Sequence, residues 1–317
     1  MLEICKIIVP TPYSVGPVNA YLIKNDPCTL VDPGPETAAA KKALEDGLSA
    51  AGVATGDIKR VLITHGHSDH SGLARWVAER AHARVYVHKL EIRKLTPEYY
   101  YYKERLPFFV EAGLPEFELR DIIDDTDPVV KPVLPDSIIE PVEGGEELYF
   151  NGGLLQVLHL PGHTSGHICL YDPVEKVLLA GDFMLKHITP NTVMEADHLD
   201  FSRRTPALRQ YLNSLKVVEE MDVKINMPGH GEAIENNSEM AVKIQEHHER
   251  RLENIQTLLD DKSLNAYQLM RLFYPKIKGF QIFLGISEIV AHLDYLLETE
   301  RIIRKEQDGM SMYHEKV

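Results

Sequence analysis

The chain has 317 residues, 44% of them hydrophobic and 26% charged, and a formal net charge of −14. This length suits one large domain or two smaller ones, and the acidity argues against a non-specific binder of nucleic acid. No apolar run approaches the ~18 residues of a membrane span, and "MLEICKIIVP" lacks the features of a signal peptide. The scattered Cys5, Cys28 and Cys169 predict buried thiols rather than disulfides, as in a cytoplasmic protein.

Residues 1–95 alternate between strand and helix patterns. Short β-rich runs punctuated by proline and glycine predict the strands. The Ala- and Lys-rich residues 36–51 predict a helix, and residues 71–81 predict another. The predicted strands of this part are "ICKIIVP", "NAYLIK", "CTLVDPG", "RVLITH" and "ARVYVH".

A different texture spans residues 95–135, where four consecutive tyrosines, Tyr99 to Tyr102, stand among phenylalanines and prolines. We expect a partly helical insertion lying over the main body. Strand patterns return in "GEELYF", "LLQVLHL", "GHICLYD" and "KVLLAGD", which predict a meander. A helix around residues 205–220 and a strand at "VKINMPGHG" follow.

The strands stop near residue 238. A polar helix to about residue 260, a short helix at "NAYQLMRLFYP", an amphipathic helix over residues 286–299 and a hairpin turning at Asp308-Gly309 follow. This order predicts a winged-helix-like domain over residues 238–317, after a first domain over residues 1–237. The amphipathic helix contains acidic residues and no Lys or Arg, which argues against DNA recognition. We expect it to pack on the first domain, to close one wall of its cleft or to form a homodimer contact.

The stretch "THGHSDH", residues 64–70, places four metal-ligand side chains directly after a predicted buried strand. Side chains at i and i+2 of an extended segment point the same way, so His65 and His67 can reach one ion. Asp69 and His70 can reach a second. The stretch therefore offers ligands for two metal ions.

Three more ligand-type residues follow predicted strands, each beside a glycine that lets the backbone bend closely. They are His163 in "PGHTSGH", Asp182 in "LLAGDF" and His230 in "MPGHG". Imidazole and carboxylate suit zinc, with iron or manganese as alternatives. Two such ions ~3.5–4 Å apart stabilise both attacking and leaving oxygens and bring the pKa of water down to ~7. The chemistry then needs no Ser or Cys nucleophile, and no motif for one is evident.

These motifs, in this order, resemble those of the metallo-β-lactamase superfamily, and "LVDPG" with Asp32 is similar to the family's first motif. The resemblance covers residues 1–236 outside the insertion. It implies an α+β fold, a four-layer αβ/βα sandwich with the metals at one edge between two sheets. It also implies His65, His67 and His163 at the first metal, Asp69, His70 and His230 at the second, and Asp182 as the bridge. "GISEIVAHLDYLLETERI" resembles the winged-helix extension of a hydrolase branch that includes ribonucleases and thioesterases.

The same resemblance separates this chain from three branches of the family. True β-lactamases as a rule lack the bridging aspartate, so Asp182 argues against antibiotic hydrolysis. The 47 residues between Asp182 and His230 are too few for the large cap domain inserted in some nucleases. Glyoxalase II enzymes carry a different C-terminal helical domain.

Other residues near the motifs have supporting or substrate roles in this interpretation. Asp32 follows a buried strand and is expected to anchor the "THGHSDH" loop. We expect a structural hydrogen bond from His167, and we name Phe183 and His187 as residues that support the site or contact substrate. Two interpretations of the tyrosines stay open: a face packing the insertion onto the body, or a lid in which Tyr99 and Tyr102 line an apolar pocket.

The resulting prediction is a cytoplasmic binuclear hydrolase with two divalent metal ions. A hydroxide held between the ions would attack an ester, thioester or lactone carbonyl, and Asp69 would orient it while binding the second ion. The predicted partner is a small-molecule acyl substrate. No membrane association is predicted. Two alternatives remain: a metal-dependent endoribonuclease acting on single-stranded RNA, which the acidity disfavours, and a non-catalytic winged-helix binding protein with a metal site.

Overall fold

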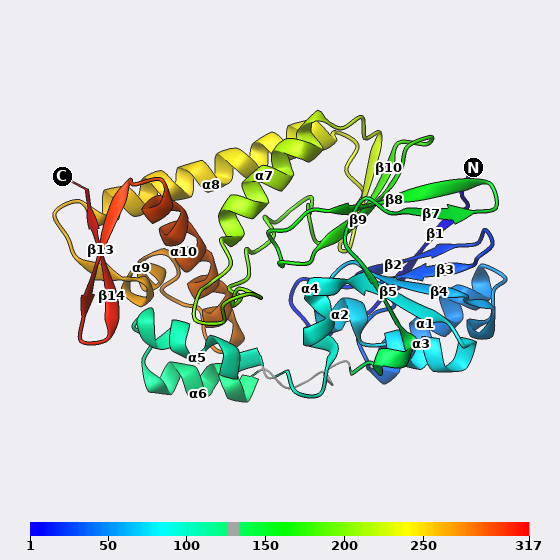
Figure 1. The fold of residues 1–317 in the computed structure, drawn as a ribbon, viewed down its shortest axis with the longest axis horizontal. Helices are drawn as coiled ribbons and strands as arrows, with labels where there is room; N and C mark the ends of the chain where they lie inside the picture. The colour runs from blue at the N-terminus through cyan, green and yellow to red at the C-terminus, as the bar shows by residue number, and fades with distance from the viewer. Residues whose placement is uncertain (100, 126–132, 317) are drawn as a thin grey trace.

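The computed structural model describes residues 1–99, 101–125 and 133–316. Two sheets stand face to face with helices on their outer sides, and a group of helices with a small third sheet lies at the other end of the molecule (Figure 1). This arrangement is the predicted α+β sandwich of four layers.

The first sheet has six strands in sequence order, antiparallel from β1 to β3 and parallel from β3 to β6. Helices α1 (Ala38–Ala50) and α3 (Ala74–Ala81) cover its outer face, where Leu44 and Val77 pack with Val61 in one apolar cluster. The strands are β1 (Ile4–Val9), β2 (Val18–Ile23), β3 (Thr29–Val31), β4 (Arg60–Ile63), β5 (Arg84–His88) and β6 (Ile139–Val142).

The second sheet has the order β11-β10-β9-β8-β7 and contains the predicted meander. Leu155 and Leu170 from this sheet meet Leu62 of the first sheet in the core between them. On the outer face, Leu215 of α7 (Ala207–Glu220) packs on Leu178. The strands are β7 (Glu147–Phe150), β8 (Gly153–His159), β9 (Ile168–Asp172), β10 (Val177–Gly181) and β11 (Ile225–Pro228).

The predicted helix over residues 71–81 is in fact the end of α2 (Ser68–Ser71) followed by α3, with Gly72 and Leu73 between the two helices. A Cβ on Gly72 would lie 2.4 Å from the backbone nitrogen of Glu36 and 2.8 Å from the carbonyl carbon of Pro35. The chain therefore passes closely under another loop at this point, which only glycine permits. As a result, Asp69 and His70 stand on one helical turn rather than on an extended loop.

The insertion contains helices α5 (Tyr101–Glu111) and α6 (Glu116–Asp125), in agreement with the prediction that it is partly helical. Its apolar residues Phe108, Phe109 and Ile122 belong to one buried cluster with the C-terminal helices. The rings of Phe109 and Phe283 meet edge to face at 6.2 Å. The described part of the insertion thus packs mainly on the C-terminal helices rather than over the sheets, because those helices offer it an apolar surface.

The C-terminal elements follow the predicted order of helices and a final hairpin, which turns at Asp308-Gly309. The last helix begins at Phe280 rather than at residue 286, because Gly279 adopts a positive φ of 54° that ends the preceding turn. The elements are α8 (Asn237–Leu259), β12 (Leu264–Asn265), α9 (Ala266–Phe273), α10 (Phe280–Glu298), β13 (Ile302–Gln307) and β14 (Met310–Glu315). The winged-helix assignment and the boundary at residue 238 stay predictions.

By length and composition, α10 could cross a membrane, but 67% of its most apolar window is buried inside the protein. It forms the centre of the C-terminal apolar cluster, so we interpret it as a core helix. Short connecting helices complete the described chain. They are α4 (Lys89–Ile92), η1 (Thr55–Asp57), η2 (Arg93–Leu95) and η3 (Asp136–Ile138).

Candidate metal centre

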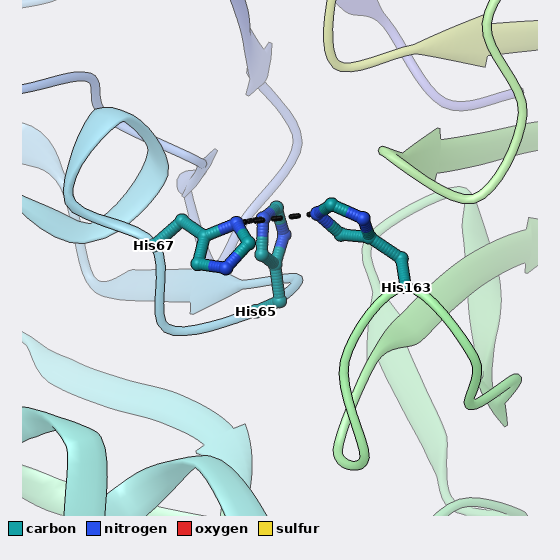
Figure 2. A group of neighbouring side chains, drawn as sticks. All are labelled: His65, His67 and His163. Carbon is teal, nitrogen blue, oxygen red and sulfur yellow. Dashed lines mark hydrogen bonds between the residues drawn. The ribbon is translucent and has the colours of Figure 1, made fainter. Parts of the chain in front are cut away.

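Three imidazole rings converge between the two sheets (Figure 2). His65 and His67 come from the loop between β4 and α2, and His163 comes from the loop after β8. His67 Nδ1 lies 2.9 Å from His65 Nε2 and 3.2 Å from His163 Nε2. These are the three residues predicted to bind the first ion, and nitrogens of all three lie close enough to share one.

A second group, Asp69, His70 and His230, lies beside the first. Asp69 Oδ2 is 3.4 Å from His230 Nε2 and 3.9 Å from His70 Nε2. Asp182 Oδ2 lies 3.5 Å from His70 Nε2, 3.7 Å from His230 Nε2 and 3.9 Å from His163 Nε2. Asp182 therefore stands between the two groups, in the position expected of a bridge.

The donors of this cluster fit a divalent transition metal. His70 Nε2, His230 Nε2 and Asp182 Oδ1 are buried and have no hydrogen-bond partner within the described residues. Such buried polar atoms are costly unless something satisfies them, and imidazole with carboxylate is a donor set that zinc accepts. A Cβ on Gly229 would lie 2.5 Å from Asp182 Oδ1, so the "MPGHG" loop can deliver His230 here only with glycine.

Hydrogen bonds on the outer ring nitrogens orient two of these histidines. His163 Nδ1 lies 2.7 Å from the carbonyl oxygen of Asn191, and His230 Nδ1 lies 2.9 Å from that of Pro17. A carbonyl can only accept, so each ring donates from Nδ1. Each Nε2 therefore keeps its lone pair for a metal ion.

Asp32 is the predicted anchor of the "THGHSDH" loop, and its contacts confirm this. Its Oδ1 accepts a bond from the Thr64 backbone nitrogen at 2.8 Å, and its Oδ2 accepts from the Thr64 hydroxyl at 2.7 Å. The same Oδ2 lies 2.9 Å from His70 Nδ1. One buried carboxylate thus fixes the start of the loop and the orientation of a ligand ring.

Charges inside the cluster favour a bound cation. Burial alone would lower the pKa of His70, but Asp182, Asp69 and Asp32 outweigh it and hold that pKa well above its usual range. Burial raises the pKa of Asp182, but His70 and the other imidazoles more than reverse this and lower it well below its usual range. The carboxylate side of the cluster therefore attracts positive charge. At the first group, burial and His163 lower the pKa of His67 to about 3, so its ring is neutral and able to bind.

Comparison with known proteins agrees with this geometry. A model of the metallo-β-lactamase superfamily matches residues 13–230. This chain belongs to the metallo-β-lactamase superfamily. It is 31% identical to the probable metallo-hydrolase YqjP of Bacillus subtilis, over 98% of this chain and 97% of the relative. The solved structure of the metallo-β-lactamase family protein TTHA1429 from Thermus thermophilus is similar with a TM-score of 0.85 and 30% identity, covering 99% of this chain and 98% of that one.

A more distant relative in the superfamily is the hydroxyacylglutathione hydrolase GloC of Haemophilus influenzae. It is 29% identical over 55% of this chain and 70% of the relative. Hydrolytic relatives of this kind imply that the present chain is a hydrolase as well.

The remaining predicted residues are His167, Phe183 and His187. The Asp182 backbone nitrogen donates to His167 Nε2 at 3.2 Å, which confirms a structural bond for His167. Phe183 is fully buried and meets Tyr211 edge to face at 5.5 Å, so it supports the Asp182 loop rather than facing substrate. His187 is exposed on the following loop and is absent from the ligand groups found among the described residues.

The structure describes one of the two tyrosines singled out in the insertion. The Tyr99 hydroxyl accepts a bond from Arg105 Nη1 at 2.8 Å. Its ring lines a hollow of about 330 Å³ together with Arg93 and Phe201. None of the residues that line this hollow is a predicted metal ligand. The Tyr102 side chain lies outside the described residues, so the lid interpretation stays a prediction.

Sequence reasoning missed a buried group of charges beside the metal loops. Lys94 Nζ lies 2.8 Å from Glu91 Oε1 and 2.5 Å from Glu195 Oε1. All three side chains are at most 5% exposed. An available signal was the spacing of Glu91 and Lys94 in "KLEIRKL", where charges at i and i+3 share one face of a helical turn.

A third cluster of ligand-type residues lies away from this centre, between α8 and α10. His248 Nδ1 is 3.1 Å from His292 Nε2, and Glu288 Oε1 lies 4.0 and 3.8 Å from these two atoms. The Arg251 guanidinium, with Nε 3.6 Å from the same carboxylate oxygen, already supplies a positive charge there. We interpret this cluster as a hydrogen-bonded contact. It places His248 in the buried contact between α8 and α10.

Proposed function

We propose that this protein is a binuclear metallohydrolase that cleaves an ester, thioester or lactone bond. The observation that carries the proposal is the position of Asp182, whose Oδ2 lies within 3.9 Å of histidines from both groups. When bound, two divalent ions would supply a nucleophile from water at neutral pH and polarise the bond to be cleaved. Zinc is the ion proposed first, with iron and manganese as alternatives.

The residues of the chain divide the remaining work. His65, His67 and His163 would hold the first ion as neutral rings. Asp69, His70 and His230 would hold the second, and Asp69 would also orient the attacking water as a hydrogen-bond acceptor. Burial of the cluster excludes bulk water and strengthens each of these electrostatic contacts.

An acyl substrate is favoured over nucleic acid by two observations. The net charge of −14 opposes a polyanionic substrate, and the name of the relative GloC specifies hydroxyacylglutathione, an acyl compound. We therefore place a small-molecule acyl substrate at the metal centre, with single-stranded RNA as the alternative.

The test is a substrate panel of thioesters, esters, lactones and single-stranded RNA, measured with metal-loaded protein and with chelated protein. We expect chelator-sensitive acyl hydrolysis that disappears in His67→Ala and persists in the control His198→Ala, which removes an exposed histidine. RNA cleavage with the same sensitivity and inert acyl substrates would establish the ribonuclease alternative. Bound metal without turnover of any substrate would favour the binding protein.

A further inference from the structure

The Glu91–Lys94–Glu195 triad is held almost entirely out of water. Glu91 lies on α4, Lys94 on the adjoining η2, and Glu195 on the segment between β10 and α7. Burying three charges is costly unless each one is paired and hydrogen-bonded. Lys94 provides the pairing, because its ammonium group contacts both carboxylates. The other hydrogen bonds that the two carboxylates accept indicate which part of the protein the triad supports.

Apart from an ion pair of Glu195 Oε1 with Arg105 Nη2 at 3.9 Å, these bonds go to the loops that carry the first metal's ligands. Glu91 Oε2 accepts from the Gly66 backbone nitrogen at 2.7 Å, and Glu91 Oε1 accepts from that of Gly166 at 2.9 Å. Glu195 Oε2 accepts from the Ser165 backbone nitrogen at 3.0 Å and from its hydroxyl at 2.7 Å. Gly66 stands between His65 and His67, and residues 165 and 166 closely follow His163. The triad therefore ties together two loops that come from different sheets.

The glycines of both motifs make room for this contact. A Cβ on Gly66 would lie 2.9 Å from Glu91 Oε2, and one on Gly166 would lie 2.8 Å from Glu91 Cγ. Real Cβ atoms do not approach so closely, so a side chain at either position would displace the carboxylate. The glycines in "THGHSDH" and "TSGH" are thus explained by Glu91 rather than by a metal ligand.

The ligands of the second ion are held by other groups. His70 is bonded to Asp32 and His230 to the carbonyl of Pro17. Within the described residues, no hydrogen bond or ion pair joins the triad to Asp69, His70 or His230. The triad therefore supports only the first half of the centre, whereas Asp32 reaches both halves, through Thr64 beside His65 and through His70.

We propose that Glu91, Lys94 and Glu195 are positioning residues that set the affinity of the first metal site selectively. This inference rests on the proposed binuclear centre. Replacing Lys94 by methionine would leave two buried carboxylates that repel each other, with only Arg105 beside Glu195 to offset the repulsion, and the two loops would separate. We expect a loss of about 10- to 100-fold in first-site affinity, the range found when partners of metal ligands are removed, with the second site changed by less than about 3-fold.

The experiment is a stepwise Co²⁺ titration of metal-free protein followed by absorption spectroscopy. His163→Ala and His230→Ala assign the two binding steps to the first and second site. The variants are Lys94→Met and the milder Glu91→Gln, which removes one of the two carboxylate acceptors at constant shape. Lys89→Met is the matched control, because Lys89 lies on α4 with Glu91 and pairs with Glu143 at the surface. Circular dichroism checks that each variant folds. If Lys94→Met does not fold, the result for Glu91→Gln alone tests the proposal.

Selective weakening of the first step in both variants, with the control unchanged, supports the proposal. Equal weakening of both steps, or no weakening, overturns it while leaving the binuclear centre intact. A wild-type protein that binds fewer than two ions overturns the proposed function, and the positioning role falls with it.

Discussion

The metal centre at the strand ends and the contact between α8 and α10 both bury histidines beside a carboxylate. They differ in the source of positive charge, although each leaves a buried imidazole nitrogen without a hydrogen bond among the described residues, His230 Nε2 at the first and His248 Nε2 at the second. At the metal centre, Asp69 and Asp182 have histidine partners, and buried atoms such as His230 Nε2 lack a hydrogen bond among the described residues. At the helix contact, Arg251 supplies the positive charge near Glu288. The difference teaches that buried ligand-type residues indicate a metal site only when no side chain nearby already supplies the positive charge that their carboxylates require.

The largest expected effect comes from breaking the bridge. Asp182→Asn keeps the shape of the side chain but removes the charge between the two histidine groups. We expect hydrolysis to fall by more than about 100-fold, above the 10- to 100-fold typical for partners of metal ligands. Steady-state kinetics on the best substrate of the panel measures this. His248→Gln, at the helix contact, should change activity less than about 3-fold, and a comparable loss there would contradict the distinction between the two regions.

The next effect comes from the anchor Asp32. Asp32→Asn leaves one acceptor oxygen where Thr64 and His70 now share two. Both metal affinity and hydrolysis should fall by about 10- to 100-fold. Metal competition with a coloured chelator gives the affinity. Unchanged affinity would mean that the loop is held without this carboxylate.

Removing metal should destabilise the protein by emptying the metal centre, and the contact between α8 and α10 should not contribute to this loss. Each of the two ions, present at about 100 times its Kd, contributes about 2.7 kcal/mol. Chelation should then lower Tm by about 5–10 °C, which differential scanning calorimetry resolves. The double variant His248→Gln/His292→Gln should show the same shift. A shift that vanishes in the double variant would place an ion at the helix contact instead.

The smallest effect concerns acid. Burial lowers the pKa of His248 and of His292 to about 3, whereas both titrate near 6.5 when unfolded. Between pH 6.5 and 3 the unfolded chain binds more protons, so stability is full above 6.5 and falls as the pH drops. Urea unfolding across this range should show a pH slope that is smaller by about two protons in the double variant. An unchanged slope would mean that these rings are protonated in the folded state.

Much of the metal centre could be predicted from sequence because its ligands are local features of strand ends. His65, His67, Asp69 and His70 stand in seven consecutive residues, and the other ligands each follow a strand with a glycine at its end. The ligands at these strand ends come together once the strands form two facing sheets. Asp32 could be foreseen for the same reason, since it ends the strand beside β4.

What the sequence did not reveal depends on contacts between distant segments. Glu91 meets Gly166 across 75 residues, and no local pattern marks a carboxylate that bonds backbone nitrogens. Strand β6 was missed because Pro141 interrupts its apolar pattern. Gly72 itself keeps helical dihedral angles, and the break between α2 and α3 falls where the Leu73 backbone nitrogen donates to the carbonyl oxygen of Gly34 on a distant loop. The insertion packs on α10, a partner that its own composition could not specify.

The most direct test of the account is elemental analysis of protein purified from metal-replete cells, for the wild type, Asp182→Asn and His248→Gln. The account predicts about two transition-metal ions per chain in the wild type and in His248→Gln, and fewer in Asp182→Asn. A wild-type protein without stoichiometric metal, or one whose metal is lost in His248→Gln and retained in Asp182→Asn, would contradict it.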